Sequence, residues 1–313
     1  MSWQQKLLSW YQKHKRNLPW RRTKDPYKIW VSEIMLQQTT VETVIPYYGR
    51  FLKKFPDIKT LAKSSEEEVL KMWSGLGYYS RARNLWKAAR MLCRGAPWRA
   101  PLEMGAASSE MGAASSAPTV EELMTLPGIG RYTAGAIASI AFEKRVPILD
   151  GNVIRVLSRL YRISADPKSS KGQKVFWKRA EDTLPGQGGI SYGDFNQALM
   201  ELGATVCLPE NPICLLCPVR EDCQAHQKGK PTDFPKGKKK TVYQNVILTA
   251  AVIQKQGQIL VVQRQNKGLL KGFWEIPMVE GDLEILVKTW PVKIIRALPC
   301  VRHSVLNKRL KIF

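Results

Sequence analysis

The sequence predicts a mainly α-helical protein that ends in a smaller α/β domain. Two observations support this prediction: apolar residues recur at helical spacing up to Val206, and their period changes to two from Val246 onward. Between these regions, residues 227–242 are rich in lysine, glycine and proline, a composition typical of linkers. We therefore expect a helical domain over residues 1–226, a basic linker, and a second domain over residues 243–313. In the second domain we expect a β-hairpin from Val246–Ile253 and Gln258–Arg264 around a turn at Gly257, and further strands near Phe273–Met278 and Lys293–Leu298.

The composition argues against a membrane-spanning or disulfide-stabilised protein. The chain contains no apolar run of about 18 residues, and its first residues lack the apolar segment of a signal peptide. Its 49 Lys and Arg outnumber its 26 Asp and Glu, which gives a net charge of +23. Nucleic acid suits such a surplus best, and an anionic membrane surface is the competing interpretation. We expect a monomer in the cytoplasm, associated with the nucleoid in a prokaryote.

The segment LPGIG, from Leu126 to Gly130, separates two helical patterns. The paired glycines Gly128 and Gly130 allow positive φ and close approach of another backbone. Amide hydrogens at the start of the second helix would point outward and favour an anion, and Gly135 would let that helix pack closely. The segment is therefore interpreted as a helix-hairpin-helix with a phosphate-sized notch. The alternative is an ordinary corner between two helices.

Two carboxyl groups stand out from their surroundings. Glu33 interrupts the apolar helical pattern from Tyr27 to Gln38, so burial should raise its pKa and suit it to general acid catalysis. Asp150 follows an apolar run and precedes another helical pattern, which makes it a candidate N-cap whose pKa the helix amides should lower. The alternatives are that Glu33 points to solvent and that Asp150 only caps its helix.

A glycine-rich segment, GLGYYSRARNL, runs from Gly75 to Leu85. Its tyrosines and arginines suit base stacking and phosphate contacts, whereas the alternative is a turn whose aromatic rings pack in the core. Nearby helices are expected over Val41–Phe55, with a kink or restart at Pro46, and over Glu66–Trp73 behind a serine cap. The duplicated unit EMGAASS, residues 103–116, is expected to be a disordered insert.

Four of the six cysteines lie within seventeen residues and include one C-x-x-C pair. This spacing indicates a metal site in a reducing compartment, and it leaves zinc and an iron–sulfur cluster both possible. The remaining cysteines, Cys93 and Cys300, are expected to be small buried hydrophobes. The clustered residues are Cys207, Cys214, Cys217 and Cys223.

Together these segments resemble the MutY-type adenine DNA glycosylases of the endonuclease III-like superfamily. The motifs VSEIMLQQT, GLGYYSRARNL, LPGIGRYTAGAI and PILDGNVIRVLSR, followed by the four cysteines, stand in that family's order. The resemblance covers nearly all of residues 1–223. It implies the helix-hairpin-helix glycosylase fold, with a six-helix barrel and a second subdomain made from both ends of the glycosylase region. The second subdomain would carry a [4Fe–4S] cluster on the four cysteines.

The resemblance also implies an activity in base excision repair: adenine opposite 8-oxoguanine or guanine in double-stranded DNA is flipped out and its N-glycosidic bond is hydrolysed. Glu33 would protonate the purine as general acid, and Asp150 would stabilise the oxocarbenium-like sugar. Tyr132 and Asn152 would help position Asp150 and the sugar. The DNA-binding and base-binding residues would be Trp20, Arg21, Leu36, Gln38, Val41, Tyr78, Arg83, Gly128, Gly130 and Gln197.

Residues 243–313 resemble the family's Nudix-like C-terminal domain, which contacts 8-oxoguanine, in an incomplete or divergent form. The glutamate-rich box of a Nudix hydrolase is missing from Gly281–Val287, which argues against a magnesium-dependent pyrophosphohydrolase. Val305–Asn307 stands where the family carries an aromatic-Ser/Thr-His triplet. Ser304 and Asn307 are therefore the expected lesion contacts, and we expect a reduced preference for 8-oxoguanine.

Two other functions compete with this prediction. An endonuclease III-like glycosylase/AP lyase needs a lysine amine for Schiff-base chemistry, and the chain carries Tyr132 where the lyases carry that lysine. A non-catalytic DNA-binding iron–sulfur protein would be marked by loss of Glu33 or Asp150, and both residues are present.

Overall fold

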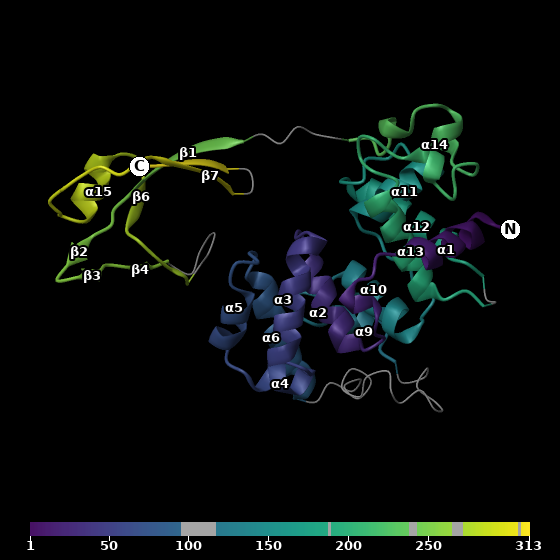
Figure 1. Ribbon diagram of the computed structural model, residues 1–313, viewed down its shortest axis with the longest axis horizontal. Helices are drawn as coiled ribbons and strands as arrows, with labels where there is room; N and C mark the ends of the chain where they lie inside the picture. Colours follow the sequence, from purple (N-terminus) through teal and green to yellow (C-terminus); the bar gives the residue numbers. More distant parts are fainter. Residues whose placement is uncertain (95–116, 187–188, 238–242, 265–271, 306–307) are drawn as a thin grey trace. The chain divides into compact units, whose positions relative to one another are not determined.

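The chain divides into two compact units, Met1–Gly237 and Lys238–Phe313, and each is described by itself (Figure 1). The EMGAASS repeat, the end of the linker, and the predicted lesion contact Asn307 lie outside the described residues. No helix in the described ranges has the length and apolar character needed to cross a bilayer. The computed structural model describes residues 1–94, 117–186, 189–237, 243–264, 272–305 and 308–313.

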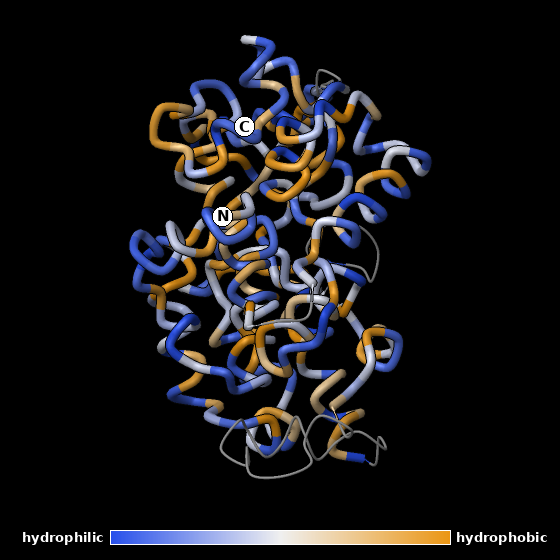
Figure 2. Tube along the Cα trace, turned by 90° about the vertical axis from the view of Figure 1, so that its right-hand side faces the viewer, coloured by the Kyte–Doolittle hydropathy of each residue, from blue (hydrophilic) through white to orange (hydrophobic). Residues whose placement is uncertain are grey.

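Unit 1 is helical in its described part. Hydrophilic and hydrophobic residues alternate every few positions along the trace, as amphipathic helices require (Figure 2). Its helices are α1 (Trp3–His14), α2 (Pro26–Leu36), α3 (Val41–Lys54), α4 (Ile58–Lys63), α5 (Glu66–Trp73), α6 (Ser80–Cys93), α9 (Val120–Met124), α10 (Arg131–Phe142), α11 (Gly151–Leu160), α12 (Ser170–Thr183), α13 (Tyr192–Thr205) and α14 (Gln224–Gln227), with 3₁₀ turns η1 (Pro19–Arg21), η3 (Cys214–Leu216) and η4 (Pro231–Asp233).

Local signals set most of the helix starts. Ser65 caps α5 through a capping box with Glu68, because each side chain satisfies a backbone amide that the helix leaves unpaired. The predicted restart at Pro46 is wrong: α3 continues through this proline. Pro46 is the sixth residue of α3, so its missing amide removes one hydrogen bond without ending a helix that tertiary packing stabilises.

Two hydrophobic clusters form the core of unit 1, and α10 contributes to both. Ala134 and Ile137 belong to the cluster built mainly from α2, α3, α5 and α6, whereas Ala136 and Ile140 belong to the cluster built mainly from α1, α11, α12 and α13. The small-residue run of α10 is therefore buried on both sides, which explains why this helix lacks a polar face.

The start of the chain packs against the end of unit 1. Helix α1 lies beside α13 (Figure 1), and the rings of Trp3 and Phe195 lie 5.9 Å apart. The second cluster is therefore closed by segments almost 200 residues apart, as the family resemblance implied for the cysteine-bearing subdomain.

The hairpin between α9 and α10 depends on two glycines. Gly128 has a φ of +81°, and a Cβ there would lie 2.7 Å from Asn84 Cβ. A Cβ at Gly135 would lie 2.6 Å from the carbonyl oxygen of Pro147, so the predicted close packing of α10 is confirmed. Of the two glycines only Gly128 adopts positive φ, since the φ of −92° at Gly130 is that of an extended N-cap residue.

Unit 2 contains a mixed sheet in the order β6-β1-β8-β7. The first strand pairs antiparallel with β6 and parallel with β8, and β8 pairs antiparallel with β7. The short strands β2 and β3 pair with each other, as do β4 and β5. The elements are β1 (Gln244–Ala250), β2 (Gln254–Lys255), β3 (Gln258–Ile259), β4 (Val262–Gln263), β5 (Trp274–Glu275), β6 (Met278–Glu280), α15 (Leu283–Thr289), β7 (Val301–Val305) and β8 (Lys308–Ile312).

The strand predictions were partly right. The predicted turn at Gly257 joins β2 to β3, but the long hairpin around it is wrong because β1 pairs with β6 and β8 instead. The strand predicted over Lys293–Leu298 is also wrong: this segment has no regular structure. Cys93 is half-buried, whereas Cys300 is exposed, contrary to the expectation of burial.

Candidate active site

Glu33 lies on α2 with 5% of its surface exposed. The hydroxyl of Tyr132, in the first turn of α10, donates a hydrogen bond to Glu33 Oε2 at 2.6 Å. Burial raises the pKa of Glu33 to about 7; the Tyr132 hydrogen bond and Arg21 oppose this rise, and Asp150 adds to it. The predicted rise in pKa is confirmed, and the solvent-facing alternative is wrong. A carboxyl with this pKa can hold and release a proton near neutral pH.

Tyr132 has a different partner from the one expected. The resemblance implied that it helps position Asp150, but its hydroxyl donates to Glu33 and also lies 3.4 Å from Met200 Sδ. Burial raises the pKa of Tyr132 well above its usual value. The phenol therefore remains a hydrogen-bond donor to the carboxyl group.

Asp150 is the N-cap of α11, as predicted. Its carboxyl accepts hydrogen bonds from Val153 N at 2.7 Å and from Asn152 Nδ2 at 2.9 Å. The predicted lowering of its pKa is wrong: burial raises the pKa of Asp150 above its usual value, although both hydrogen bonds oppose the rise. Asp150 is half-buried, and the loss of solvation around its carboxyl outweighs the hydrogen bonds from the helix amides.

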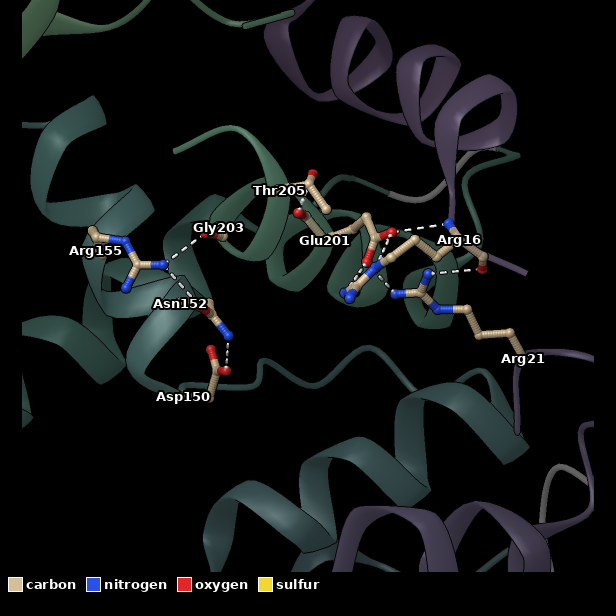
Figure 3. Close-up of polar contacts among 8 residues, drawn as sticks. All are labelled: Arg16, Arg21, Asp150, Asn152, Arg155, Glu201, Gly203 and Thr205. Atoms are coloured by element: carbon tan, nitrogen blue, oxygen red, sulfur yellow. Dashed lines mark hydrogen bonds and ion pairs between the residues drawn. The ribbon is translucent and has the colours of Figure 1, made fainter. Parts of the chain in front are cut away.

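Asn152 connects Asp150 to a third residue, Arg155, which the sequence did not single out (Figure 3). Arg155 Nη2 donates to Asn152 Oδ1 at 2.8 Å and to the Gly203 carbonyl at 2.7 Å. Arg155 Nε donates to the Cys207 carbonyl at 2.7 Å. Hydrogen bonds therefore join Asp150 to the backbone of the first clustered cysteine, and the only sequence signal was the i, i+3 spacing on α11.

Glu201 on α13 is a buried charge that sequence reasoning missed. Its carboxylate accepts hydrogen bonds from Arg16 N, Nε and Nη2 at 2.9–3.0 Å and from Arg21 Nη2 at 2.8 Å (Figure 3). Burial acts to raise the pKa of Glu201, but the hydrogen bonds from both arginines outweigh it and lower the pKa to about 2. The available signal was an acid in an apolar helical pattern, the same signal that identified Glu33.

The expected base-pocket residues lie on several elements of unit 1. Arg21 belongs to η1 and is held by Glu201. Trp20, its neighbour in η1, is buried and meets the Tyr48 ring edge-on at 5.4 Å. Leu36 ends α2 and Val41 begins α3, and both are half-buried against the first core cluster. Gln197 is buried on α13.

Gln38 and Tyr78 are both exposed on loops. Tyr78 is 45% exposed, although a large aromatic ring usually favours burial. Both residues have left-handed backbones, with φ of +57° at Gln38 and +48° at Tyr78. Residues without a glycine's freedom seldom adopt this conformation, and it is concentrated at functional positions.

The other residues predicted to contact DNA, Arg83, Gly130 and Ser304, lie in three different surroundings. Arg83 Nε forms an ion pair with Glu66 Oε1 at 2.7 Å, which joins α6 to α5, so its guanidinium serves a structural contact. Gly130 caps α10 without a side-chain hydrogen bond, which leaves first-turn amides to an external anion. Ser304 is an exposed residue of β7 in unit 2, paired with Arg309 of β8.

The four clustered cysteines line one cavity. Cys207 follows α13, Cys214 begins η3 and Cys223 caps α14. All four are free of disulfides, and Arg159 Nη1 lies 3.3 Å from Cys207 Sγ. Across the described ranges, no three histidine, cysteine or acidic side chains converge on a position for a single metal ion.

Comparison with known proteins agrees with this arrangement. Residues 31–182 match the HhH-GPD superfamily of base excision DNA repair proteins. The chain is 41% identical to the adenine DNA glycosylase of Rattus norvegicus, over 87% of this chain and 59% of the rat protein. It is 39% identical to the adenine DNA glycosylase of Buchnera aphidicola, over 90% of this chain and 75% of that protein.

Among solved structures, a thermostable thymine-DNA glycosylase matches with a TM-score of 0.59 and 28% identity, over 72% of this chain and 95% of that one. The chain thus spans about three-fifths of the rat relative's length and three-quarters of the bacterial relative's length. The matches cover the hairpin, Glu33 and Asp150 together. The chain belongs to the adenine DNA glycosylase family, within the HhH-GPD superfamily of base excision repair proteins.

Proposed function

We propose that this chain is a monofunctional DNA N-glycosylase that removes adenine mispaired with 8-oxoguanine or guanine. The observation that carries the proposal is the buried carboxyl of Glu33, whose pKa of about 7 lies near the pH of the cell. The hydroxyl of Tyr132 orients this carboxyl at 2.6 Å, and Asp150 is close enough to raise its pKa. A proton donor beside a second carboxyl is what acid-assisted cleavage of a glycosidic bond requires.

In this reaction Glu33 donates its proton to N7 of the flipped adenine. The bond between the sugar C1′ and the purine N9 breaks, and its electron pair leaves with the base. The carboxylate of Asp150 stabilises the positive charge that develops on the sugar. Water then adds to C1′ and gives a proton to the Glu33 carboxylate, which restores the acid. The products are free adenine and an abasic site.

The partner is double-stranded DNA. The net charge of +23 supports phosphate binding, and the uncapped start of α10 offers backbone amides to one phosphate. Gln38 and Tyr78 would enter the base stack beside the target, because both are exposed and held in an uncommon backbone conformation. Stacking of neighbouring bases on the tyrosine ring would offset part of the stacking energy that the duplex loses when a base is flipped out.

Cys207, Cys214, Cys217 and Cys223 would hold a [4Fe–4S] cluster. Four thiolates can hold either a [4Fe–4S] cluster or zinc, and these four cysteines line one cavity; the family resemblance favours the cluster. Burial raises the pKa of Cys217, and the charge of a bound metal centre would stabilise its thiolate form. When bound, the cluster would cross-link the segment between Cys207 and Cys223 and keep it folded.

Recognition of the opposite base is assigned to unit 2. Ser304, in β7, carries a hydroxyl that can bind the edge of a base. Val305–Asn307 offers neither the aromatic ring nor the histidine of the family triplet. We therefore propose excision opposite both 8-oxoguanine and guanine, with a discrimination reduced by a few-fold to about tenfold per missing hydrogen bond.

The proposed function is tested with duplexes that carry adenine opposite 8-oxoguanine, guanine or thymine, followed by alkali cleavage. The protein should release adenine from the first two, and Glu33→Gln should lower the single-turnover rate by at least about 10²-fold while duplex binding is retained. Full activity in Glu33→Gln would remove Glu33 from the mechanism.

Borohydride trapping distinguishes this proposal from the lyase alternative. A lyase forms an imine between a lysine and the sugar, which borohydride reduces to a covalent adduct. Tyr132 occupies the expected lysine position and donates to Glu33 instead. A strong covalent adduct between the protein and DNA would therefore contradict monofunctional hydrolysis.

A further inference from the structure

Arg81 on α6 is buried between the loops that carry Gln38 and Tyr78. Its side chain sits among backbone oxygens, with 8% of the residue exposed. Arg81 Nη1 donates to the carbonyls of Ile34 at 3.0 Å and Met35 at 2.8 Å, at the C-terminal end of α2. A cation at this end of a helix is favoured by unpaired carbonyls and by the helix dipole.

The guanidinium also contacts the residue directly before each exposed side chain. Arg81 Nη1 donates to the Gln37 carbonyl, which belongs to the peptide bond that leads into Gln38. Arg81 Nη2 donates to the Gly77 carbonyl at 3.1 Å, which belongs to the peptide bond that leads into Tyr78. One side chain therefore orients the two peptide planes on which the left-handed conformations depend.

Further contacts hold the same loops in place. Arg81 Nη2 donates to Thr39 Oγ1 at 3.1 Å and to the Leu76 carbonyl at 3.3 Å. The guanidinium carbon lies 5.4 Å from the ring centre of Tyr78 and 5.4 Å from that of Trp73. The indole of Trp73 donates to the same Gly77 carbonyl at 3.1 Å. These contacts join the loop after α2 to the loop before α6.

We propose that Arg81 is a positioning residue that holds Gln38 and Tyr78 as one rigid wedge for insertion into the DNA base stack. This inference rests on the proposed function, since a wedge is needed only where a base is flipped. Arginine suits the role because both terminal nitrogens of its planar guanidinium donate in fixed directions at once, whereas lysine offers a compact charge. Burial lowers the pKa of Arg81 to about 10, so the side chain stays charged at neutral pH.

Arg81→Lys tests the proposal, with Arg90→Lys as the matched control. Arg90 lies on the same helix, where its guanidinium covers the Trp86 ring at 4.8 Å. Base flipping is followed by the fluorescence of 2-aminopurine placed beside the target adenine, and excision by single-turnover rates. Arg81→Lys should reduce the flipping signal and slow excision by about 10-fold to 100-fold, the usual cost of a misplaced contact. Arg90→Lys should match the unmodified protein.

Two readouts separate positioning from general damage. Affinity for an undamaged duplex should change by less than about twofold in Arg81→Lys, because phosphate contacts do not need the wedge. In a Tyr78→Ser background, Arg81→Lys should slow excision by clearly less than it does alone, since coupled residues are not additive. Full additivity, an equal loss of undamaged-duplex binding, or unchanged flipping would each overturn the proposal.

The outcomes also show whether a negative result contradicts the wedge proposal or the glycosylase function on which it rests. If the unmodified protein leaves adenine in place, the glycosylase assignment fails. If it removes adenine and Arg81→Lys does so equally well, only the wedge proposal fails. Should Arg81→Lys not fold, Arg81→Met decides, because it keeps the unbranched apolar part of the side chain and removes every donor to the two loops. An unchanged flipping signal in Arg81→Met overturns the proposal.

Discussion

Tyr132→Phe should shift the pH dependence of adenine removal, although it replaces one neutral side chain with another. The Tyr132 hydroxyl donates to Glu33 Oε2 at 2.6 Å, and this hydrogen bond lowers the pKa of Glu33 against the larger effect of burial. Phenylalanine keeps the ring and removes the donor. The carboxylate of Glu33 then loses a stabilising contact, so its pKa should rise above the present value of about 7.

The size of the shift follows from the contact that is lost. A hydrogen bond to a charged group contributes about 1.5–3 kcal/mol, and each pKa unit corresponds to about 1.36 kcal/mol. Tyr132→Phe should therefore raise the pKa of Glu33 by about one to two units. Since Glu33 acts in its protonated form, activity is present below its pKa and lost above it. The alkaline fall in rate should move upward in pH by the same amount.

The assay is the single-turnover rate of adenine removal from about pH 5.5 to about pH 9.5, a range that brackets the pKa of Glu33 before and after the change. Tyr27→Phe is the matched control, because Tyr27 is a buried tyrosine at the start of the same helix whose hydroxyl donates to the Phe55 carbonyl at 2.9 Å. The alkaline fall in the pH–rate profile of Tyr27→Phe should occur at the same pH as in the unmodified protein. If the alkaline fall of the pH–rate profile of Tyr132→Phe is unchanged or lies at lower pH, this hydrogen bond does not set the pKa of Glu33.

Three further changes give distinct outcomes. Asp150→Asn should slow base removal by about 10²-fold or more with little change in thermal midpoint, because asparagine also caps helices; a loss of stability alone would make Asp150 only a cap. Glu201→Gln should lower the free energy of unfolding by about 3 kcal/mol, because it removes the negative charge that compensates the buried guanidinium of Arg21. In the unmodified protein, the stability that Glu201 contributes should be present above its usual pKa and lost as the pH falls toward about 2; equal denaturant midpoints at pH 7 would contradict this. Cys217→Ser should lose iron and blue-region absorbance and weaken DNA binding more than excision at bound adenine, whereas stoichiometric zinc in the unmodified protein would contradict the cluster assignment.

Elements with local signals could be read from the sequence. The hairpin follows from Pro127 and Gly128, the cap of α11 follows from Asp150, and the cap of α5 follows from Ser65. Each of these features depends on residues a few positions apart. The raised pKa of Glu33 was also predictable, because an acid in an apolar helical pattern has little access to solvent on any packing of that helix.

Pairings between distant segments were decided only by the tertiary structure. Tyr132 meets Glu33 rather than Asp150 because α10 packs against α2, and no spacing along the chain encodes that contact. The same holds for Glu201, which binds arginines about 180 residues earlier, and for the Arg81 contacts to the loop after α2. The sign of the Asp150 pKa shift also required the fold: helix amides act locally, whereas desolvation depends on everything packed around the carboxyl.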